Sequence, residues 1–168
     1  MFKKELYLLE MQNIVAFFNK EKDGHLKDLP IKDQWKLLSA IKQIQPKVQE
    51  FEEFRNKLND DLQKEYFGEE SEKSEETQIP QTDENGENIL DADGNVVMQD
   101  ARKVKDEYID EFQTKVNSLN EELQKLLVEK TEFEFKGFNL DEIVENLPND
   151  SKITLDDINM ISFLDESE

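Results

Sequence analysis

The stretch IKDQWKLLSAIKQIQPKVQEFEEFRNKLNDDLQKEY, residues 31–66, decides the fold of this chain. Its apolar residues recur at steps of three or four positions, which is the spacing of one face of an α-helix. This face comprises Ile31, Trp35, Leu38, Ile41, Ile44, Val48, Phe51, Phe54, Leu58, Leu62 and Tyr66. Pro46 falls inside the run, but the apolar spacing continues through it. We therefore predict one continuous helix that is kinked at Pro46.

A second run with the same spacing follows further along the chain. It comprises Val104, Tyr108, Ile109, Phe112, Val116, Leu119, Leu123, Leu126 and Leu127. Two such helices joined by an insert fold back most simply as a long antiparallel hairpin, and an N-terminal helix over residues 5–20 can cover one side. The spacing predicts core packing for the aromatic residues on these faces, Trp35, Phe51, Phe54 and Phe112. An intermolecular coiled coil is the alternative.

The segment between the two helices has two halves. Residues 68–77, GEESEKSEET, are mostly acids and hydroxyls and do not bury enough apolar area to order themselves. The second half contains Asn85-Gly86 and Asp93-Gly94, pairs that are typical of type I′ turns. We predict a small β-hairpin or meander there, at the tip of the helical pair.

The C-terminal part combines one strand with short helices. Apolar and charged residues alternate over 131–138, which predicts a half-buried strand. Asn139 is a candidate N-cap for a short helix, and Thr154 with Asp157 resembles a capping box before a last helix over 155–164. The inner face of that helix comprises Leu155, Ile158, Ile161 and Leu164, and the closing DESE (165–168) is expected to fray. The predicted fold class is mainly α with minor β structure, as a single domain over 1–168.

The charge is unevenly distributed along the chain. The total is −20, but residues 1–67 carry twelve acidic and twelve basic side chains and are neutral. Residues 68–100 carry −10 and residues 139–168 carry −8, so an acidic insert and an acidic C-terminal segment belong to a nearly neutral scaffold. Such a chain is repelled by nucleic-acid backbones and anionic membranes. We expect other proteins as partners, with no direct nucleic-acid binding and no membrane; the pattern also allows a homo-oligomer.

No motif in the sequence indicates an active site. There is no cysteine, and the one histidine, His25, lies in a polar turn, so we expect a surface residue. Asp83-x-Asn85 and Asp91-x-Asp93 resemble parts of a calcium loop, but the glycine comes at position four rather than six, which favours turns. Adjacent acidic pairs such as Asp156/Asp157 are typical of a solvated helix face. We predict no catalytic, cofactor-binding or metal-binding residues, and no enzyme.

The candidate partner contacts are apolar residues that a helix or a turn region can expose. Adjacent phenylalanines cannot both enter one helix seam, so Phe17 or Phe18 is a candidate. The other candidates flank the two turns of the insert: Ile89, Leu90, Val96 and Val97.

The order of these elements resembles a family of small uncharacterised proteins of tailed bacteriophages and prophages, often encoded near structural or tail genes. The residues that carry the resemblance are LPIK (29–32), VQEFEEFRNKLNDDLQKEY (48–66), the DENG and DADG turns (83–94), and DEYIDEFQTKVNSLNEELQKLL (106–127). The likeness covers residues 5–165, and the acidic block over 68–77 extends the family's shorter connection. The resemblance implies a phage origin and a non-enzymatic role, with no catalytic residues to carry over.

Two functions are consistent with these observations. The first is a phage-encoded protein–protein interaction protein, a small virion component or assembly factor, located in the host cytoplasm during assembly and in the virion. The second is an acidic nucleic-acid mimic that inhibits a host DNA-binding or defence protein. The neutral residues 1–67 favour the first, because a duplex mimic spreads acids at phosphate-like spacing over a whole face.

Overall fold

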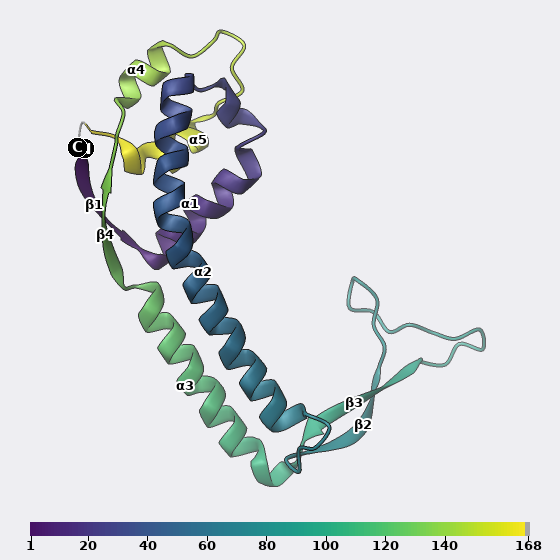
Figure 1. Ribbon diagram of the computed structural model, residues 1–168. Coiled ribbons are helices and arrows are strands. Elements are labelled where there is room, and N and C mark those ends of the chain that lie inside the picture. The colour runs from purple at the N-terminus through teal and green to yellow at the C-terminus, as the bar shows by residue number, and fades with distance from the viewer. Residues whose placement is uncertain (167–168) are drawn as a thin grey trace. The chain divides into compact units, whose positions relative to one another are not determined.

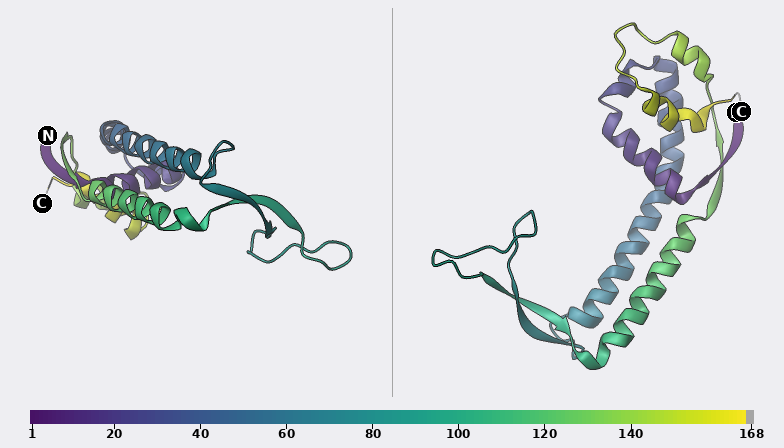
Figure 2. Two further views of the ribbon diagram at one scale, coloured as in Figure 1. Left: turned by 90° about the horizontal axis from the view of Figure 1, so that it is seen from below. Right: turned by 180° about the vertical axis from the view of Figure 1, so that it is seen from behind.

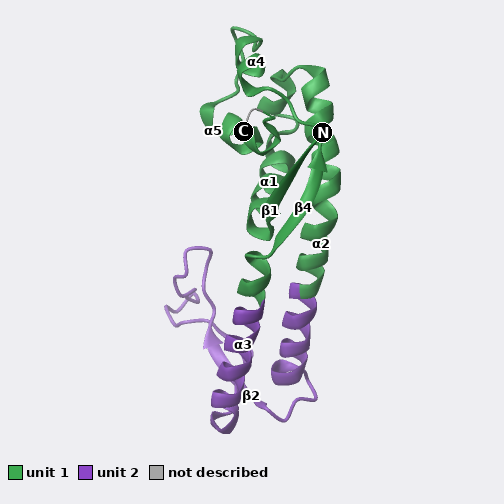
Figure 3. Cartoon of the chain, turned by 90° about the vertical axis from the view of Figure 1, so that its left-hand side faces the viewer, with its two compact units in different colours: residues 1–54, 123–168 green, residues 55–122 purple. Residues whose placement is uncertain are grey.

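The computed structural model describes residues 1–166 and is mainly helical with two small antiparallel sheets (Figure 1). The predicted class of a mainly α fold with minor β structure is confirmed. The chain divides into two compact units: unit 1 contains residues 1–54 and 123–168, and unit 2 contains residues 55–122 (Figure 3).

Two long helices, α2 (Ile31–Phe67) and α3 (Ile109–Leu127), contribute residues to both units. The acidic insert over 68–100 belongs to unit 2, and the acidic segment over 139–168 belongs to unit 1. The single domain over 1–168 stays a prediction.

Unit 1 begins with a strand that the sequence analysis missed. We predicted a helix over 5–20, but β1 (Phe2–Tyr7) pairs antiparallel with β4 (Lys130–Phe135), and α1 (Leu8–Glu21) begins only after it. The register places Phe2 opposite Phe135 and Leu6 opposite Thr131. The predicted strand over 131–138 is confirmed as far as Phe135, where β4 ends. A single exposed strand leaves its backbone groups unpaired. Pairing with residues 2–7 satisfies these groups and buries Leu6.

The core of unit 1 gathers residues from both ends of the chain. Elements β1, α1, the 3-10 helix η1 (His25–Asp28), the start of α2, β4 and the C-terminal helices all contribute to it. The fully buried large side chains of this core are Met11, Ile44, Phe135, Ile143, Ile161 and Leu164. Phe135 makes edge contacts with Phe2 and Phe163 at centroid distances of 6.3 and 5.7 Å.

Core packing of Trp35 was predicted wrongly. Its side chain is 64% exposed, and Ile31, one turn earlier, is 74% exposed. At its start, helix α2 instead buries Leu37 and Ala40 of the neighbouring face, while Ile41 and Ile44 of the predicted face are buried as expected. Two overlapping apolar stripes therefore coexist at the start of α2, and the sequence alone does not show which one faces the core. Further along the helix Phe51 is buried, as predicted, while Phe54 and Phe112 are half-buried.

Helix α2 continues through Pro46, as predicted. A proline inside a helix costs about 3 kcal/mol because a hydrogen bond is lost and the ring crowds the preceding turn. Burying one large aliphatic or aromatic side chain contributes about 1.5–3 kcal/mol. Ile41, Ile44 and Phe51 are all buried around this position, so their burial outweighs the cost. The kink itself stays a prediction.

The helix starts of the C-terminal segment follow the predicted caps. Asn139 Oδ1 accepts a hydrogen bond from the Glu142 N–H at the start of α4 (Leu140–Glu145). Thr154 and Asp157 form the capping box of α5 (Leu155–Ile161), which a 3-10 turn, η3 (Ser162–Leu164), extends. Leu155 does not lie on the inner face, because its side chain is 82% exposed.

The end of the described chain is bound rather than frayed. The Glu166 N–H donates to the Phe138 carbonyl, and the Gly137 N–H donates to Glu166 Oε1. A Cβ at Gly137 would collide with the Leu164 carbonyl oxygen at 2.5 Å, so this close approach requires glycine. The fraying predicted for 165–168 is therefore wrong for Asp165 and Glu166, and the rest of that stretch lies outside the described residues.

Unit 2 contains the end of α2, the hairpin of β2 (Ser74–Pro80) and β3 (Met98–Val104), the 3-10 turn η2 (Asp106–Tyr108) and most of α3. The two strands pair from Ser74–Val104 to Pro80–Met98 and end in two loops (Figure 2). A β-hairpin is thus present in the insert, but its strands lie mostly outside the predicted segment, where the two glycine turns lie in loops that are each closed by a single bridge. The disorder predicted for 68–77 is wrong. Ser71 and Lys73 donate hydrogen bonds to Glu65, and backbone pairing with β3 orders residues 74–77 although they bury little apolar area.

None of the helices within residues 1–166 combines the length and the apolar content that crossing a bilayer requires.

A matched pair of aromatic truncations tests the core of unit 1. We expect Phe135→Ala to lower the free energy of unfolding by about 3–5 kcal/mol, because it leaves a cavity in a close-packed core. Trp35→Ala removes an exposed ring, and we expect a loss of about 0.5 kcal/mol or less. Urea unfolding followed by far-ultraviolet circular dichroism measures both, and equal losses would contradict this assignment of the core.

Candidate protein-binding site in the insert

The insert beyond the β2–β3 stem consists of two loops with the same length and the same pattern. Residues 82–89 read TDENGENI and residues 90–97 read LDADGNVV, so aspartate and glycine recur at an interval of eight. We call residues 82–88 the first loop and residues 90–96 the second loop. Each loop is closed by one antiparallel bridge, Thr82–Asn88 in the first and Leu90–Val96 in the second.

The aspartate of each loop holds the turn. Asp83 Oδ1 accepts hydrogen bonds of 2.9 Å from the N–H groups of Asn85 and Glu87. Asp91 Oδ1 accepts bonds of the same length from the N–H groups of Asp93 and Asn95. The backbone carbonyls of the same two aspartates also accept a hydrogen bond, from the Gly86 N–H in the first loop and from the Gly94 N–H in the second. These short polar loops are therefore held by local hydrogen bonds rather than by apolar burial.

The predicted turn type was wrong, although both turns are where we expected them. A type I′ turn needs positive φ at both central residues. Only the glycines have it, with φ of 81° at Gly86 and 83° at Gly94, and no other described residue does. Asn85 and Asp93 precede these glycines within the turn that Asp83 and Asp91 begin, so glycine alone adopts the left-handed conformation.

The two loops and the stem meet at a junction of three backbone hydrogen bonds. The Gln81 N–H donates to the Val97 carbonyl, the Val97 N–H to the Ile89 carbonyl, and the Ile89 N–H to the Gln81 carbonyl, each at 2.8 Å. We call this closed ring of bonds the three-way junction. It fixes the points where both loops begin and end, and so sets the position of their side chains.

The junction brings together four of the six predicted contact residues. Ile89 and Val97 take part in it and are half-buried, whereas Leu90 and Val96, at the base of the second loop, are 58% and 38% exposed. Ile79 and Met98 add exposed apolar surface on the adjoining stem. The residues two positions from Ile79 are Thr77 and Gln81, so no apolar alternation in β2 indicates it from the sequence.

The remaining two candidates, Phe17 and Phe18, lie in unit 1. Both are half-buried and pack against its core. They are not part of the site in the insert.

The loops around Leu90 and Val96 are strongly acidic. Residues 74–101 contain eight acids and no basic residue. The Glu87 N–H holds the pKa of Asp83 below its ordinary value, and the Asn95 N–H does the same for Asp91. Both loop aspartates are thus held as anions, and the second loop presents two aliphatic side chains beside negative charge.

The calcium reading of these loops gains no support from their geometry. Oδ1 of Asp83 and Oδ1 of Asp91 face backbone N–H groups of their own loops. Within residues 1–166 no group of three or more acidic, histidine or cysteine side chains is placed to hold a metal ion.

A network of charged and aromatic side chains anchors the stem to the helices of unit 2. Lys73 Nζ lies 2.6 Å from Glu65 and 2.7 Å from Glu111, and 4.7 Å from the centre of the Tyr66 ring. The Tyr66 hydroxyl donates to Glu111 at 2.8 Å, and Lys115 pairs with both glutamates. The fully buried Tyr66 ring packs edge-on against Phe112 at 4.9 Å. Residues from α2, the loop after it and α3 are thereby joined at one point.

The network shifts the pKa values of its members in the expected directions. The Lys73 ammonium, followed by the Tyr66 hydroxyl, lowers the pKa of Glu111 from its ordinary 4.5 to about 2. Hydrogen bonds to Glu111 and Glu65 raise the pKa of Lys73. Burial, together with the bond to Glu111, raises the pKa of Tyr66.

Arg102 fixes the other side of the stem base. Its guanidinium donates to Ser74 Oγ at 3.0 Å, to the Glu69 carbonyl at 3.1 Å and to the Ser71 carbonyl at 3.1 Å. The side chain on β3 thus satisfies the acceptors of the turn that leads from α2 into β2. Arg102 thereby helps to order turn residues that were predicted to be disordered, together with Lys73 and the Ser71 hydroxyl, which donate to Glu65.

His25 has closer partners than the sequence indicated. Its Nδ1 lies 3.1 Å from Asp157 Oδ2 and 3.8 Å from Glu21 Oε2. Burial by itself raises the pKa of Asp157, but hydrogen bonds from Thr154 and His25 outweigh this effect and hold it below its ordinary value. Asp157, one of the acids we assigned to a solvated face, is in fact buried as a helix cap.

Neither the protein-family models, nor the curated proteins, nor the solved structures include a match to this chain. The functional conclusions below therefore rest on the residues, their geometry and the resemblance described above.

Removing a loop aspartate tests the hydrogen bonds of that loop. In Asp83→Ala we expect amide hydrogen exchange of Asn85 and Glu87 to accelerate roughly fivefold, as each loses an acceptor. The second loop keeps its own aspartate, so its amides should keep their rates. Glu84→Ala, at an exposed position of the same loop, is the matched control. Unchanged exchange in Asp83→Ala would refute the role of this side chain.

The pH dependence of stability tests the anchoring network. A carboxyl whose pKa is lower in the folded state contributes stability above its unfolded pKa, and this contribution is lost as pH falls through the folded value. The urea midpoint of the wild type should therefore exceed that of Glu111→Gln above about pH 4.5, and the difference should vanish near pH 2. Glu121→Gln, on the same helix, should show no such pH-dependent difference. A constant difference between wild type and Glu111→Gln down to pH 2 would contradict the network.

Proposed function

We propose that this chain is a phage-encoded, non-enzymatic protein–protein interaction protein, a small virion component or assembly factor. Its contact with a partner is formed by the second loop of the insert. The phage origin rests on the resemblance of residues 5–165 to small bacteriophage proteins. The contact rests on the geometry of the loops and of the three-way junction.

The observation that carries the proposal is that Leu90 and Val96 are exposed on a loop whose backbone is fixed by hydrogen bonds. Both side chains are placed by a loop that closes on itself, and that loop is fixed by the junction. A contact residue held in place before binding loses little conformational freedom on association, which favours affinity. The acids around the pair favour a partner with a basic surface and speed its approach.

The anchoring network supports a rigid attachment of this contact. In unit 2 the ion pair between Glu65 and Lys115 and the contact between Tyr66 and Phe112 join the end of α2 to the start of α3. We propose that the two helices continue this pairing as one long antiparallel hairpin that supports the insert. An enzymatic role has weaker support, because these charged groups are used in ion pairs with one another.

The nucleic-acid mimic is less well supported than the interaction protein. A mimic needs many unpaired acids at regular spacing over one face. Here Glu5, Glu75 and Glu132 each pair with a lysine within 3.0 Å. The insert also exposes the apolar residues Leu90, Val96 and Met98, which have no counterpart along a phosphate backbone.

The proposal is tested in the phage or prophage that encodes the chain. We expect mass spectrometry to detect the protein in purified virions or assembly intermediates, and the double variant Leu90→Asp/Val96→Asp to be depleted at least roughly tenfold, because a contact residue of this kind contributes about 1.4 kcal/mol or more. Leu155→Asp, which changes a leucine in unit 1 that is more exposed than Leu90, is the control and should be retained. Absence of the wild type from virions and intermediates would refute the proposal, and normal retention of the double variant would refute the assigned contact.

A further inference from the structure

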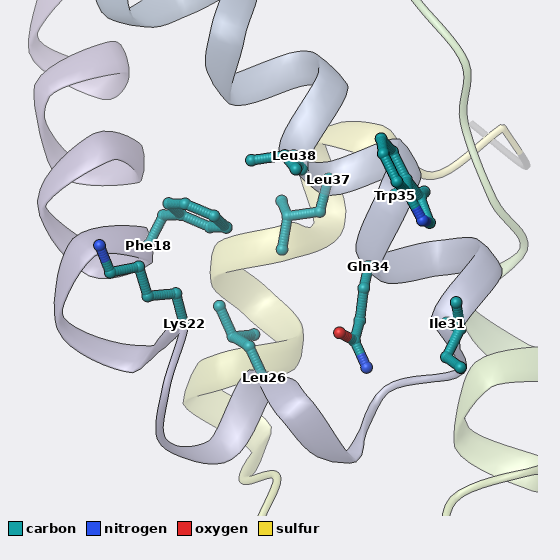
Figure 4. Close-up of a pocket in the computed structure, with 8 residues that line it drawn as sticks. All are labelled: Phe18, Lys22, Leu26, Ile31, Gln34, Trp35, Leu37 and Leu38. Carbon is teal, nitrogen blue, oxygen red and sulfur yellow. The ribbon is translucent and has the colours of Figure 1, made fainter.

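Unit 1 carries two hollows that share Trp35 in their linings. The first has a volume of about 170 Å³ and lies between the end of α1, η1 and the start of α2 (Figure 4). Its lining includes Phe18, Leu26 and Ile31. The second has a volume of about 250 Å³ and shares Trp35 and Leu38 with the first. Trp35 thus lines both recesses and is itself largely exposed.

The charged residues that line these hollows are all lysines. Lys22 lines the first, while Lys36, Lys42 and Lys136 line the second; neither lining contains an acid. Acids are about twice as frequent as bases in the whole chain, at 41 against 21, so this patch has the opposite charge to the chain as a whole. Lys36 pairs with Asp33 at 3.2 Å, whereas Lys22, Lys42 and Lys136 have no ion-pair partner among residues 1–166. The patch therefore contains, around an exposed tryptophan, three lysines that are available to pair with acids of another molecule.

The second loop of the insert has the complementary properties. Leu90 and Val96 present adjacent aliphatic side chains, and Asp91 and Asp93 supply negative charge without a cationic partner in the described residues. An apolar cavity of about 150 Å³ holds a benzene molecule, so the recesses beside Trp35 have room for one such side chain each. The negative charge of the loop is thus opposite to the positive charge of the patch, and the aliphatic side chains of the loop are small enough for the recesses.

We propose that the Trp35 patch of one molecule binds the second loop of another copy of the same chain. Leu90 and Val96 of one molecule enter the recesses beside Trp35 of the next, and the loop carboxylates meet Lys22, Lys42 and Lys136. Tryptophan is among the residues that contribute most to binding when it is surrounded by a polar rim. The surfaces are different, so the contact is head-to-tail and produces open chains or closed rings rather than a symmetric dimer.

The overall charge of −20 opposes this contact only at long range. At physiological ionic strength the Debye length is about 8 Å, so repulsion between distant acids is largely screened. The opposite charges of the patch and the loop lie close together in the contact and are screened less. Association is therefore expected to be weakest at very low salt, where repulsion extends furthest, and at high salt, where the attraction is also lost.

This inference deepens the proposed function by naming a partner for the second loop. It can fail alone. If the loop binds only another phage protein, virion incorporation still depends on Leu90 and Val96 while the purified chain stays monomeric.

The test uses two full-length variants with complementary defects. Trp35→Ala has no tryptophan but keeps the second loop, and Leu90→Asp/Val96→Asp keeps Trp35 but loses the apolar pair. We expect the wild type to show masses above the monomer in sedimentation velocity at concentrations of order 10–100 μM, as an interface with a micromolar Kd would give. Each variant alone should be monomeric. An equimolar mixture should form a 1:1 complex and stop there, because each molecule retains only one working surface.

Fluorescence gives a second readout of the same mixture. The only tryptophan in it is Trp35 of the loop variant, so a blue shift of its emission reports occupation of the patch. Leu155→Ala should assemble like the wild type, and circular dichroism should confirm that every variant keeps its helical content.

Four outcomes would overturn the inference. The mixture stays monomeric; the wild type stays monomeric at every concentration; or the emission of Trp35 is blue-shifted at all dilutions in a monomer, which would indicate that the chain covers its own patch. An acidic segment of a different protein that binds the patch while the wild type alone does not assemble would also overturn it.

Discussion

The pairing of β1 with β4 is the interaction on which unit 1 depends. It joins residues near the start of the chain to residues that follow both long helices, and it buries Leu6 and Phe135 against the same core. Neither strand has another partner in residues 1–166, so each leaves its backbone groups unsatisfied without the other. Since the paired residues are more than a hundred positions apart, both ends of the chain must come together before this core can close, a requirement that slows folding.

Unit 2 is ordered by a different physical principle. It buries few large side chains, and Tyr66 is the one that is fully enclosed. Its insert is held instead by strand pairing, by two aspartates that accept backbone hydrogen bonds, and by cations that join the turns to the helices. A segment that is too polar to form a core can still hold a fixed conformation when its hydrogen bonds are satisfied locally.

The sequence predicted the features that depend on neighbouring residues. The continuous helix through Pro46, the caps at Asn139 and Thr154, and the glycine turns of the insert all follow from local spacing and are present. It did not predict β1, because the strand that requires this partner is far away in the chain. It also placed Trp35 in the core, because two apolar stripes overlap on α2 and only tertiary packing selects between them.

The candidate contact was also predicted only in part, because the bonds that position it join residues that are not neighbours in the sequence. Leu90 and Val96 could be found beside the turn signals, but the three-way junction that positions them could not. Its bonds join Gln81, Ile89 and Val97 through backbone atoms, which leave no signature in side-chain chemistry. The roles of Lys73, inside the acidic block, and of Arg102, just after the insert, were equally hidden, since their partners lie in other elements.

The three-way junction fixes the loops through backbone hydrogen bonds, which do not depend on the side chains that the loop tips expose. Its bonds use no side-chain atoms, and each loop is closed by its own aspartate and glycine. Positions such as Glu84 and Ala92, at the loop tips, are therefore free to change without loss of the frame. A protein built in this way can acquire a new binding preference by substitution at the tips alone, while natural selection on stability acts on other positions.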